Sequence, residues 1–474
     1  MLGKVDARGY LSSHPAERRV PDALEKIRER VEVAGRRIAV LDDDPTGTQT
    51  VHGVPVLTTW SVEDLRWAFE QPSPTFYVLT NSRSLPEEEA AAMNREVASN
   101  LVAAAGQTGT DFVVTSRSDS TLRGHFPAET DALAQGLGRN IDGVILCPCY
   151  LEAGRLTADD THWVRQGEQL VPAGETEFAR DASFGYSASD LRDWVEEKTA
   201  GRVKASDVVS VGLADIREGG PARVAEILSG VDGGRPVVVN AASHADLEVL
   251  VLGLLDAEEG GKSFLYRTAL SFVRARGGIP EKSPLTAEEL YRRRPRRGHG
   301  LVLVGSHVAL TTRQLEEALK LEGVRPVELS VPRLLEEAER EEELARVAGE
   351  VNAGLAGSEV VVYTSREVVG GPGRTGFEVG RAVSDALVEV MRRVDAEAPL
   401  AFVVAKGGIT SSDVGTRGLG VRRAEVAGQM LPGIVSVWVL PEESTFPGLP
   451  YIIFAGNVGE SDSLAKVIQI LRED

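Results

Sequence analysis

The feature that most constrains this chain is the alternation of short apolar, β-branched runs with helical patterns along almost all of its 474 residues. Such alternation is typical of parallel sheets covered by helices, so it predicts an α/β fold. A chain of this length exceeds the usual size of one hydrophobic core. We therefore expect two domains, each with a largely parallel sheet covered by helices and with the active site in the cleft between the domains.

The first half contains four clear apolar runs that we interpret as strands, followed by a fifth. They are Ile38–Leu41, Phe76–Leu79, Phe112–Thr115, Val144–Cys147 and Val237–Val239. Helices are expected between them, over residues 61–70, 86–104 and 245–255. The first of these helices begins with the capping pattern Ser61-Val-Glu-Asp64.

Between Ala275 and Gly300 the composition changes to Arg, Pro, Gly and Glu without a strand pattern, which indicates a domain boundary. We expect an N-terminal extension (1–37), a substrate domain (38–275), a linker (276–299) and a second domain (300–474). In the second domain the strands are expected at 301–304, 360–363, 401–405, 434–440 and 451–454, and the helices at 312–321, 334–352, 377–394 and 462–471.

Charge and cysteine content exclude several classes of function. The formal net charge is −19, a field that repels nucleic acids and anionic membranes, so we expect neither as a partner. The arginine-rich run Arg292–Arg297 fits a solvated linker. The two cysteines, Cys147 and Cys149, build no disulfide framework, and no His cluster completes a metal site. Residues 1–30 lack an apolar signal segment, and we expect a cytoplasmic protein.

Acids, arginines and hydroxyls follow the first four strands of the first domain. The segments are Asp42-Asp43-Asp44, Thr80–Ser84 with Arg83, Arg117-Ser118-Asp119-Ser120, and Tyr150–Arg155. In open parallel sheets, ligands bind beyond the carboxyl ends of the strands. Arginine matches a carboxylate or phosphate with two parallel hydrogen bonds, and an aspartate can take the proton of an attacking hydroxyl. The pattern predicts a site for a small hydroxylated acid, although each segment alone would also suit an ordinary turn or helix cap.

Three turns of the second domain combine glycines with hydroxyl groups between a strand and a helix. They are Gly305-Ser306 with Thr311-Thr312, Lys406-Gly407-Gly408-Ile409-Thr410, and Gly456-Asn457-Val458-Gly459. Free main-chain N–H groups beside hydroxyls suit an anion, so together the turns predict a nucleotide site. Each turn alone is weak, since such turns also occur without a ligand.

Other motifs point elsewhere and carry less weight. Gly261-Lys262-Ser263 resembles the end of a phosphate-binding P-loop, but Asp256 stands where that motif needs glycine. The segment 371–376 matches the dinucleotide pattern GxGxxG, yet the next strand ends without the acid that would hold a ribose. An NAD-dependent dehydrogenase stays as an alternative, as does a non-catalytic sugar-acid sensor. His52 and His125 could each bond a substrate or simply pack.

Taken together and in this order, the segments resemble the four-carbon acid sugar kinase family. The resemblance extends from about residue 38 to the end. It rests in the first half on Asp43-Asp44-Pro-Thr-Gly47, Asn81-Ser-Arg83, Asp119–Gly124 and Glu152–Arg155, and in the second on Gly305-Ser306, Gly407–Ser411 and Gly456–Gly459.

The resemblance implies ATP-dependent phosphorylation of a hydroxyl on a four-carbon acid such as threonate or erythronate, with Mg²⁺ as the partner of ATP and no dedicated protein metal site. It implies that the base is Asp43 or Asp44. Substrate contacts are implied at Asp44, Arg83, Arg117, Ser118, Asp119, Ser120 and Arg155, and ATP contacts at Ser306, Gly407, Gly408, Ile409, Thr410 and Gly456. Arg117, His125 and Ile409 depart from the residues we associate with the family, which leaves room for a larger or differently placed acid group. The choice of acid and any homo-oligomer stay open.

Overall fold

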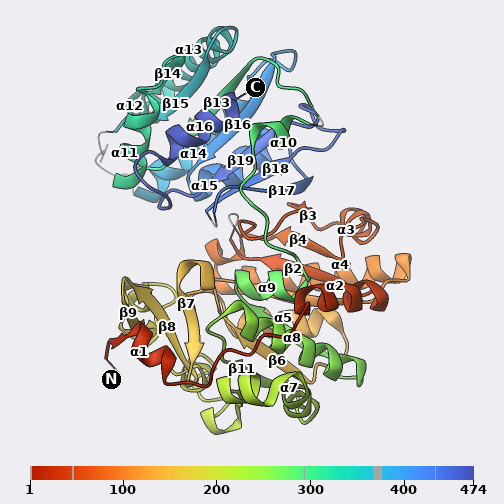
Figure 1. The fold of residues 1–474 in the computed structure, drawn as a ribbon. Helices are drawn as coiled ribbons and strands as arrows, with labels where there is room; N and C mark the ends of the chain where they lie inside the picture. Colours follow the sequence, from red (N-terminus) through yellow and green to blue (C-terminus); the bar gives the residue numbers. More distant parts are fainter. Residues whose placement is uncertain (1–2, 45–46, 293, 367–375, 433, 474) are drawn as a thin grey trace. The chain divides into compact units, whose positions relative to one another are not determined.

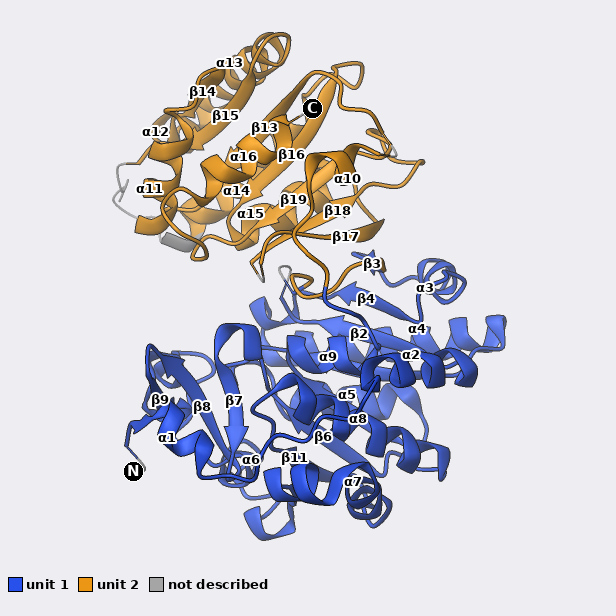
Figure 2. Cartoon of the chain, viewed as in Figure 1, with its two compact units in different colours: residues 1–47, 55–281 blue, residues 48–54, 282–474 orange. Residues whose placement is uncertain are grey.

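The computed structural model describes residues 3–44, 47–292, 294–366, 376–432 and 434–473. The chain forms two compact units, shown in different colours in Figure 2. Unit 1 contains residues 1–47 and 55–281, and unit 2 contains residues 48–54 and 282–474. The short segment 48–54 thus belongs to the second unit although it lies early in the sequence. Hydrogen bonds hold it there: Gly53 N–H donates to the Val426 carbonyl at 2.7 Å, Trp438 Nε1 donates to Thr48 Oγ1 at 3.1 Å, and the hydroxyls of Thr48 and Ser436 are 2.8 Å apart.

Unit 1 is built on a parallel sheet with the strand order β10-β11-β6-β12-β5-β2-β4-β3 (Figure 1). The strands are β2 (Arg37–Asp42), β3 (Val54–Leu57), β4 (Thr75–Leu79), β5 (Phe112–Arg117), β6 (Gly143–Cys147), β10 (Val209–Val211), β11 (Arg235–Val239) and β12 (Phe264–Thr268). The predicted parallel sheet of the first half is confirmed. Strand β12, which the sequence analysis did not predict, lies between β5 and β6.

Helices cover both faces of this sheet. They are α2 (Ala23–Ala34), α3 (Val62–Phe69), α4 (Glu87–Thr108), α5 (Ala128–Leu137), α6 (Leu191–Lys198), α7 (Gly220–Ser229), α8 (His244–Glu259) and α9 (Leu270–Arg276). Alternate residues of β2, such as Ala39 and Leu41, join a core with α3, α4 and α5. The intervening Ile38 and Val40 are equally buried and point to the opposite face, because side chains alternate along a strand.

The expected N-terminal extension is folded into unit 1. Strand β1 (Val5–Asp6) pairs with β9 (Gln169–Pro172) at the edge of a small antiparallel sheet, whose order β1-β9-β8-β7 is completed by β8 (Thr161–Gln166) and β7 (Arg155–Ala158). Helix α1 (Ala7–Ser12) follows β1, and its Tyr10 ring lies 5.0 Å from that of Trp163. The sequence analysis missed this sheet.

Unit 2 has a sheet with the order β17-β18-β19-β16-β13-β15-β14. Its strands are β13 (His299–Val304), β14 (Val324–Leu329), β15 (Glu359–Thr364), β16 (Leu400–Lys406), β17 (Arg423–Leu431), β18 (Val435–Val439) and β19 (Pro450–Phe454). From β19 to β14 the strands are parallel, and β17 and β18 form an antiparallel edge. The prediction of a largely parallel second sheet is confirmed.

The helices of unit 2 are α10 (Ala287–Tyr291), α11 (Ala309–Ala318), α12 (Val331–Leu335), α13 (Glu337–Leu355), α14 (Gly376–Arg392), α15 (Gly408–Asp413) and α16 (Ser463–Arg472). Helix α10 lies within the stretch expected to be a linker, and Leu285 and Leu290 join the core of unit 2. No helix in the described part of the chain is both long and apolar enough to span a lipid bilayer.

Candidate active site

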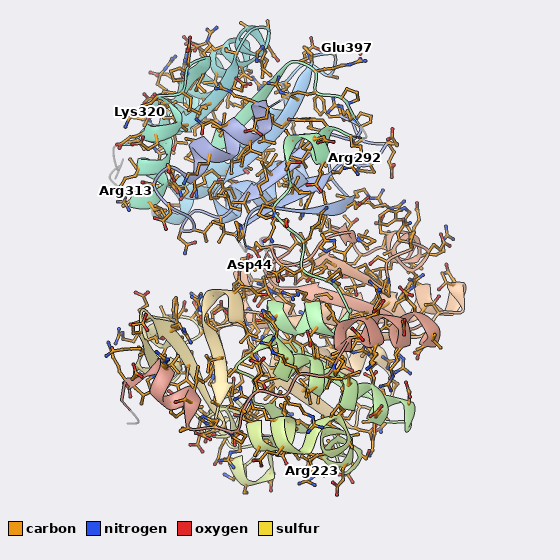
Figure 3. The ribbon with its side chains drawn as sticks, in the orientation of Figure 1. Asp44, Arg223, Arg292, Arg313, Lys320 and Glu397 are labelled. Carbon is orange, nitrogen blue, oxygen red and sulfur yellow. The ribbon has the colours of Figure 1, made fainter. Side chains whose placement is uncertain are left out.

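Strand register brings the predicted acids and arginines of unit 1 to one edge of the sheet. Asp42 is the last residue of β2 and lies opposite Arg117, the last residue of β5, and opposite Leu79 at the end of β4. Asp43 and Asp44 follow directly, and Arg83 lies on the 3₁₀ turn Ser82–Ser84 after β4. Figure 3 shows the side chains and labels Asp44.

Asp42 and Arg117 form a buried ion pair beneath this edge. Arg117 Nη1 lies 2.7 Å from Asp42 Oδ1, which also accepts from the Asp44 N–H at 3.0 Å. Burial raises the pKa of Asp42 to about 7, because Arg117 offsets only part of the cost of removing a carboxylate from water. Arg117 was predicted to bind substrate, and in this structure its Nη1 is paired with Asp42.

Asp43 and Asp44 differ in what occupies their oxygens. The Ser118 hydroxyl donates to Asp43 Oδ2, whereas Asp43 Oδ1 is buried without a hydrogen-bond partner among the described residues. The Asp44 carboxylate accepts from Arg83 Nη2, which is also 3.8 Å from Asp43 Oδ1. Burial opposes the charge on Arg83, but Asp43, Asp44 and Asp119 raise its pKa above the ordinary value, so Arg83 stays a cation.

Asp119 is the most heavily hydrogen-bonded acid of the group. Its Oδ2 accepts from Arg123 Nε at 2.8 Å and from the Thr121 hydroxyl, and its Oδ1 is 3.4 Å from Arg83 Nη1. Burial alone would raise the pKa of Asp119, but Arg83 and Arg123 hold it well below its usual range. The neighbouring Ser120 is buried, and its carbonyl accepts from the His162 ring at 2.7 Å.

Two buried charged residues of this site were missed by the sequence analysis. Arg267 on β12 donates to the Arg123 carbonyl at 3.2 Å, and the Glu129 carboxylate on α5 accepts from the Ser82 hydroxyl at 2.8 Å. Burial, followed by the charge of Asp43, raises the pKa of Glu129 to about 7. The run Phe264–Thr268 could have revealed Arg267 as another strand end, whereas nothing around Glu129 marks it.

Gly124 shows how tightly these groups are packed. Its φ is +122°, and a Cβ there would lie 2.7 Å from Ser118 Oγ, 3.0 Å from Arg267 Nη2 and 3.1 Å from Asp43 Oδ2. Only glycine can pass between them without displacing one.

The remaining predicted residues of unit 1 have partners of their own. Arg155 begins β7, donates to the Ala153 carbonyl at 2.5 Å and lies 5.9 Å from the Phe178 ring. Glu152 is bound by the Ser271 hydroxyl at 2.5 Å and lies 3.5 Å from Arg274. His125 is buried with its ring edge-on to Phe184, and its Nε2 has no hydrogen-bond partner.

In unit 2, the three predicted glycine turns meet at the carboxyl ends of β13, β16 and β19. The Thr311 hydroxyl donates to the Gly456 carbonyl at 2.7 Å, and its oxygen lies 3.2 Å from Ser306 Oγ. A Cβ at Gly456 would lie 2.7 Å from Ser306 Oγ, and one at Gly407 would lie 3.2 Å from Ser306 Cβ. Ser306, Gly407 and Gly456 are therefore in direct contact, as neighbouring strand ends allow.

Helix α15 begins after Gly407, with Gly408 at its first position and Thr410 buried against Gly305. Ile409 is 69% exposed, and Val308, which follows the neighbouring strand β13, is 45% exposed. Exposed large apolar side chains are few among the described residues, and two of them follow strands that end at the glycine turns.

Two cations of this region were not predicted as site residues. Arg366, after β15, donates Nη1 to the Ser306 carbonyl at 2.7 Å, and its Nε and Nη2 are buried without partners. Lys406 ends β16 and is fully buried. The glycine motif at 371–376, weighed as a dinucleotide site, lies almost entirely outside the described residues.

The donors present fit a nucleotide better than they fit a bare metal ion. The turns offer hydroxyls, N–H groups and space that only glycine leaves, which suits phosphate. Among the described residues, no group of three or more His, Cys, Asp or Glu side chains is placed to hold a metal.

Comparison with known protein families gives two matches that together cover most of the chain. Residues 38–276 match a sugar-binding N-terminal domain, and residues 301–464 match a nucleotide-binding C-terminal domain.

Among characterised proteins, the chain is 27% identical to a D-erythronate kinase of Heliobacterium modesticaldum over 410 residues (83% of this chain, 86% of the relative). It is 23% identical to a D-threonate kinase of Salmonella typhimurium (92% and 99% covered) and 24% identical to a 3-oxo-tetronate kinase of Pectobacterium atrosepticum (91% and 98% covered).

The fold is shared with solved structures. A Haemophilus influenzae protein, HI1011, superposes with a TM-score of 0.66 at 20% identity, over 91% of this chain and 99% of the other. A Salmonella typhimurium LT2 protein gives a TM-score of 0.67 at 19% identity, over 91% and 98%. With both halves matched in order, the chain belongs to the four-carbon acid sugar kinase family.

Proposed function

We propose that this protein transfers the terminal phosphoryl group of ATP to a hydroxyl of a four-carbon sugar acid such as threonate or erythronate. The observation that carries the proposal is the contrast between the two strand-end edges. One gathers buried carboxylates and arginines around Asp43, and the other gathers glycine turns and hydroxyls around Ser306. The relatives named as kinases of erythronate, threonate and 3-oxo-tetronate support the same substrate class.

Asp43 is our candidate for the general base. Its Oδ1 has no hydrogen-bond partner, and the Ser118 hydroxyl fixes the other oxygen, so the carboxylate is oriented and can accept a proton. Asp44 is bound by Arg83, which makes it the weaker candidate. In the proposed reaction, Asp43 takes the proton of the substrate hydroxyl while the hydroxyl oxygen bonds to the terminal phosphorus of ATP and the bond from that phosphorus to the leaving ADP breaks.

Arg83 is our candidate for the residue that binds the substrate's carboxylate. Asp44, Ser118, Asp119 and Ser120 would bind the substrate's hydroxyls. Arg117 would act on the substrate indirectly, through Asp42, and Arg267 would do so through Asp43. Burial raises the pKa values of Asp42 and Glu129 to about 7, which lowers the negative charge of the site near neutral pH. The arginines can then attract an anionic acid despite the number of carboxyl groups around them. Arg155 would contact a longer or branched acid.

In unit 2, Ser306, Gly407, Gly408, Thr410 and Gly456 would hold the phosphates, and Ile409 and Val308 would contact the base. ATP supplies the phosphoryl group, with Mg²⁺ held by phosphate oxygens and water. Main-chain N–H groups and hydroxyls bind phosphate without a flexible charged side chain. Such binding suits a phosphoryl transfer that depends on positioning.

A coupled ADP-release assay over threonates, erythronates and related four-carbon acids tests the proposal. We expect one acid to give turnover well above the ATP-only rate. Isothermal titration should show ADP binding without NADH binding. Tight NADH binding with no ADP signal would instead support the dehydrogenase alternative.

A further inference from the structure

The Gly456 turn is held from beneath by a buried lysine. Lys406 Nζ donates to the Ala455 carbonyl at 2.5 Å and lies 3.3 Å from the Gly456 carbonyl. The ammonium group also lies 3.9 Å from the centre of the Phe454 ring. Full burial of a lysine costs free energy unless its amine is hydrogen-bonded, and here main-chain carbonyls accept those bonds.

These bonds determine where the N–H groups of the turn point. A trans peptide is planar, so its carbonyl and its N–H point in opposite directions. The Ala455 carbonyl accepts from Lys406, and the Gly456 carbonyl accepts from the Thr311 hydroxyl at 2.7 Å with Lys406 Nζ 3.3 Å away. The N–H groups of Gly456 and Asn457 therefore point away from these donors. In the described part of the chain, neither of these N–H groups donates to another protein group. Two successive free N–H groups form an anion-binding concavity.

Lys406 also lacks a negative partner. The titratable groups on the elements around it are engaged elsewhere: His307, after β13, bonds to Thr364, Tyr451 on β19 donates to the Ser411 carbonyl, and Asp413 on α15 accepts from Ser384. Among the described residues, no carboxylate forms an ion pair with Lys406. Burial lowers the pKa of Lys406 to about 7, so near neutral pH much of the amine is uncharged.

We infer that Lys406 is a positioning residue for the nucleotide, which turns the N–H groups of Gly456 and Asn457 toward phosphate and takes up a proton when the nucleotide binds. The inference rests on the proposed nucleotide site and deepens it. An anion bound on the far side of the turn supplies the missing negative charge and favours the protonated amine. The protonated amine in turn holds the two carbonyls more firmly than a neutral one.

Proton uptake is measured directly by calorimetry. ADP with excess Mg²⁺ is titrated into the protein at pH 8 in two buffers of different ionisation enthalpy, at a pH where the terminal phosphate of ADP is already ionised. We expect uptake of roughly 0.5 to 1 proton per ADP bound, because little of Lys406 is protonated beforehand. ADP binding without uptake at pH 8 would overturn the inference and leave the nucleotide site intact.

Lys406→Met provides the second arm, since methionine keeps the apolar packing on Phe454 but removes the charge and the donors. We expect ADP affinity to fall by about tenfold or more, proton uptake to disappear, and binding of the sugar acid to be unchanged. The matched control is Lys466→Met, which removes an exposed lysine paired with Asp462 on α16 and should behave like the parent.

The outcomes separate the two proposals. If the Lys406→Met variant folds and keeps the parental ADP affinity and the parental proton uptake, the role of Lys406 is refuted but the nucleotide site is not. A parent protein that binds no ADP refutes the nucleotide site and this inference with it. If Lys406→Met does not fold, proton uptake by the parent protein decides.

Discussion

The strand-end edges of the two units use opposite chemistry on sheets of the same kind. In unit 1, side chains fill the edge: Asp42, Asp43 and Asp119 are paired with Arg117, Arg83 and Arg123. In unit 2, the edge consists mainly of main chain and hydroxyls, with Gly456 and Gly407 packed on Ser306. A parallel sheet thus provides a place for a ligand, and the residues that follow its strands decide which ligand fits.

The comparison also shows two ways of managing buried charge. At the strand-end edge of unit 1, Arg83, Arg117 and Arg123 are each paired with an aspartate. Lys406 in unit 2 contacts two carbonyls and the Phe454 ring and has no acidic partner among the described residues, so its charge stays available to a ligand. The ion pairs of unit 1 fix the side-chain geometry before a ligand binds. In unit 2, the ligand supplies the negative charge that balances Lys406.

The largest effect is expected from Asp43→Asn. Asparagine can still accept the Ser118 hydrogen bond, but it cannot take the proton of a substrate hydroxyl. Turnover should fall by about a hundredfold or more, with ADP affinity preserved. Steady-state kinetics and ADP titration check this. If Asp44→Asn loses more turnover than Asp43→Asn, Asp44 is the base and Asp43 is not. If both variants keep full activity, Asp119 becomes the next candidate.

Arg83→Ala should come next, and it sharpens the assignment of charge recognition to unit 1. Loss of a charged contact is typically worth roughly 2–3 kcal/mol, so affinity for the sugar acid should fall some thirty- to hundredfold while ADP affinity stays nearly unchanged. Titration of both ligands into the variant measures this. Arg66→Ala, at an exposed arginine of α3, is the control. Normal acid affinity in Arg83→Ala would show that Arg83 only holds Asp44 and Asp119.

Gly456→Ala tests the main-chain site of unit 2. The added methyl would lie 2.7 Å from Ser306 Oγ, so the turn must shift. ADP affinity should fall by about tenfold, and acid binding should not change. Gly349→Ala on α13, where a Cβ meets nothing within 4 Å, is the matched control and should bind ADP like the parent. Equal ADP affinity in both alanine variants would remove Gly456 from the site.

The smallest effect is on the pH dependence of stability, through Glu129. Its folded pKa of about 7 lies above the unfolded value of about 4.3, so the folded state holds a proton that the unfolded state has lost between these values. This contribution to stability is present at low pH and is lost as the pH rises through 7.

Glu129→Gln stays neutral throughout and should lose that dependence. Relative to the parent, the variant should gain on the order of 1 kcal/mol in free energy of unfolding between pH 5 and pH 8. Urea unfolding at both pH values measures the gain, and Glu87→Gln at the exposed start of α4 is the control. An identical pH dependence in parent and Glu129→Gln would show that the proton is shared differently among the buried acids.

Much of the fold followed from local patterns. The apolar runs placed β2, β4, β5 and β6 within a residue or two, and Ser61 caps α3 as its motif predicted. Strand β8 was missed because it ends in exposed polar residues and pairs in an antiparallel sheet. The rule that ligands lie beyond strand ends selected Asp43, Arg83 and Asp119, which the structure brings together. The rule also selected Arg155, whose pKa responds to the charge of Asp119.

The sequence by itself determined the kinds of element, the residues at the strand ends and the family, because periodicity and motifs are local properties of the chain. Only the tertiary structure decided which strands are neighbours. The insertion of β12 between β5 and β6 brings Arg267 close to Asp43, and residues 48–54 join unit 2 through bonds to β17 and β18. Such contacts join residues up to hundreds of positions apart. Local patterns fit several possible strand neighbours equally well, and strand pairing and burial select one arrangement. Burial also gave Asp42, Glu129 and Lys406 their shifted pKa values.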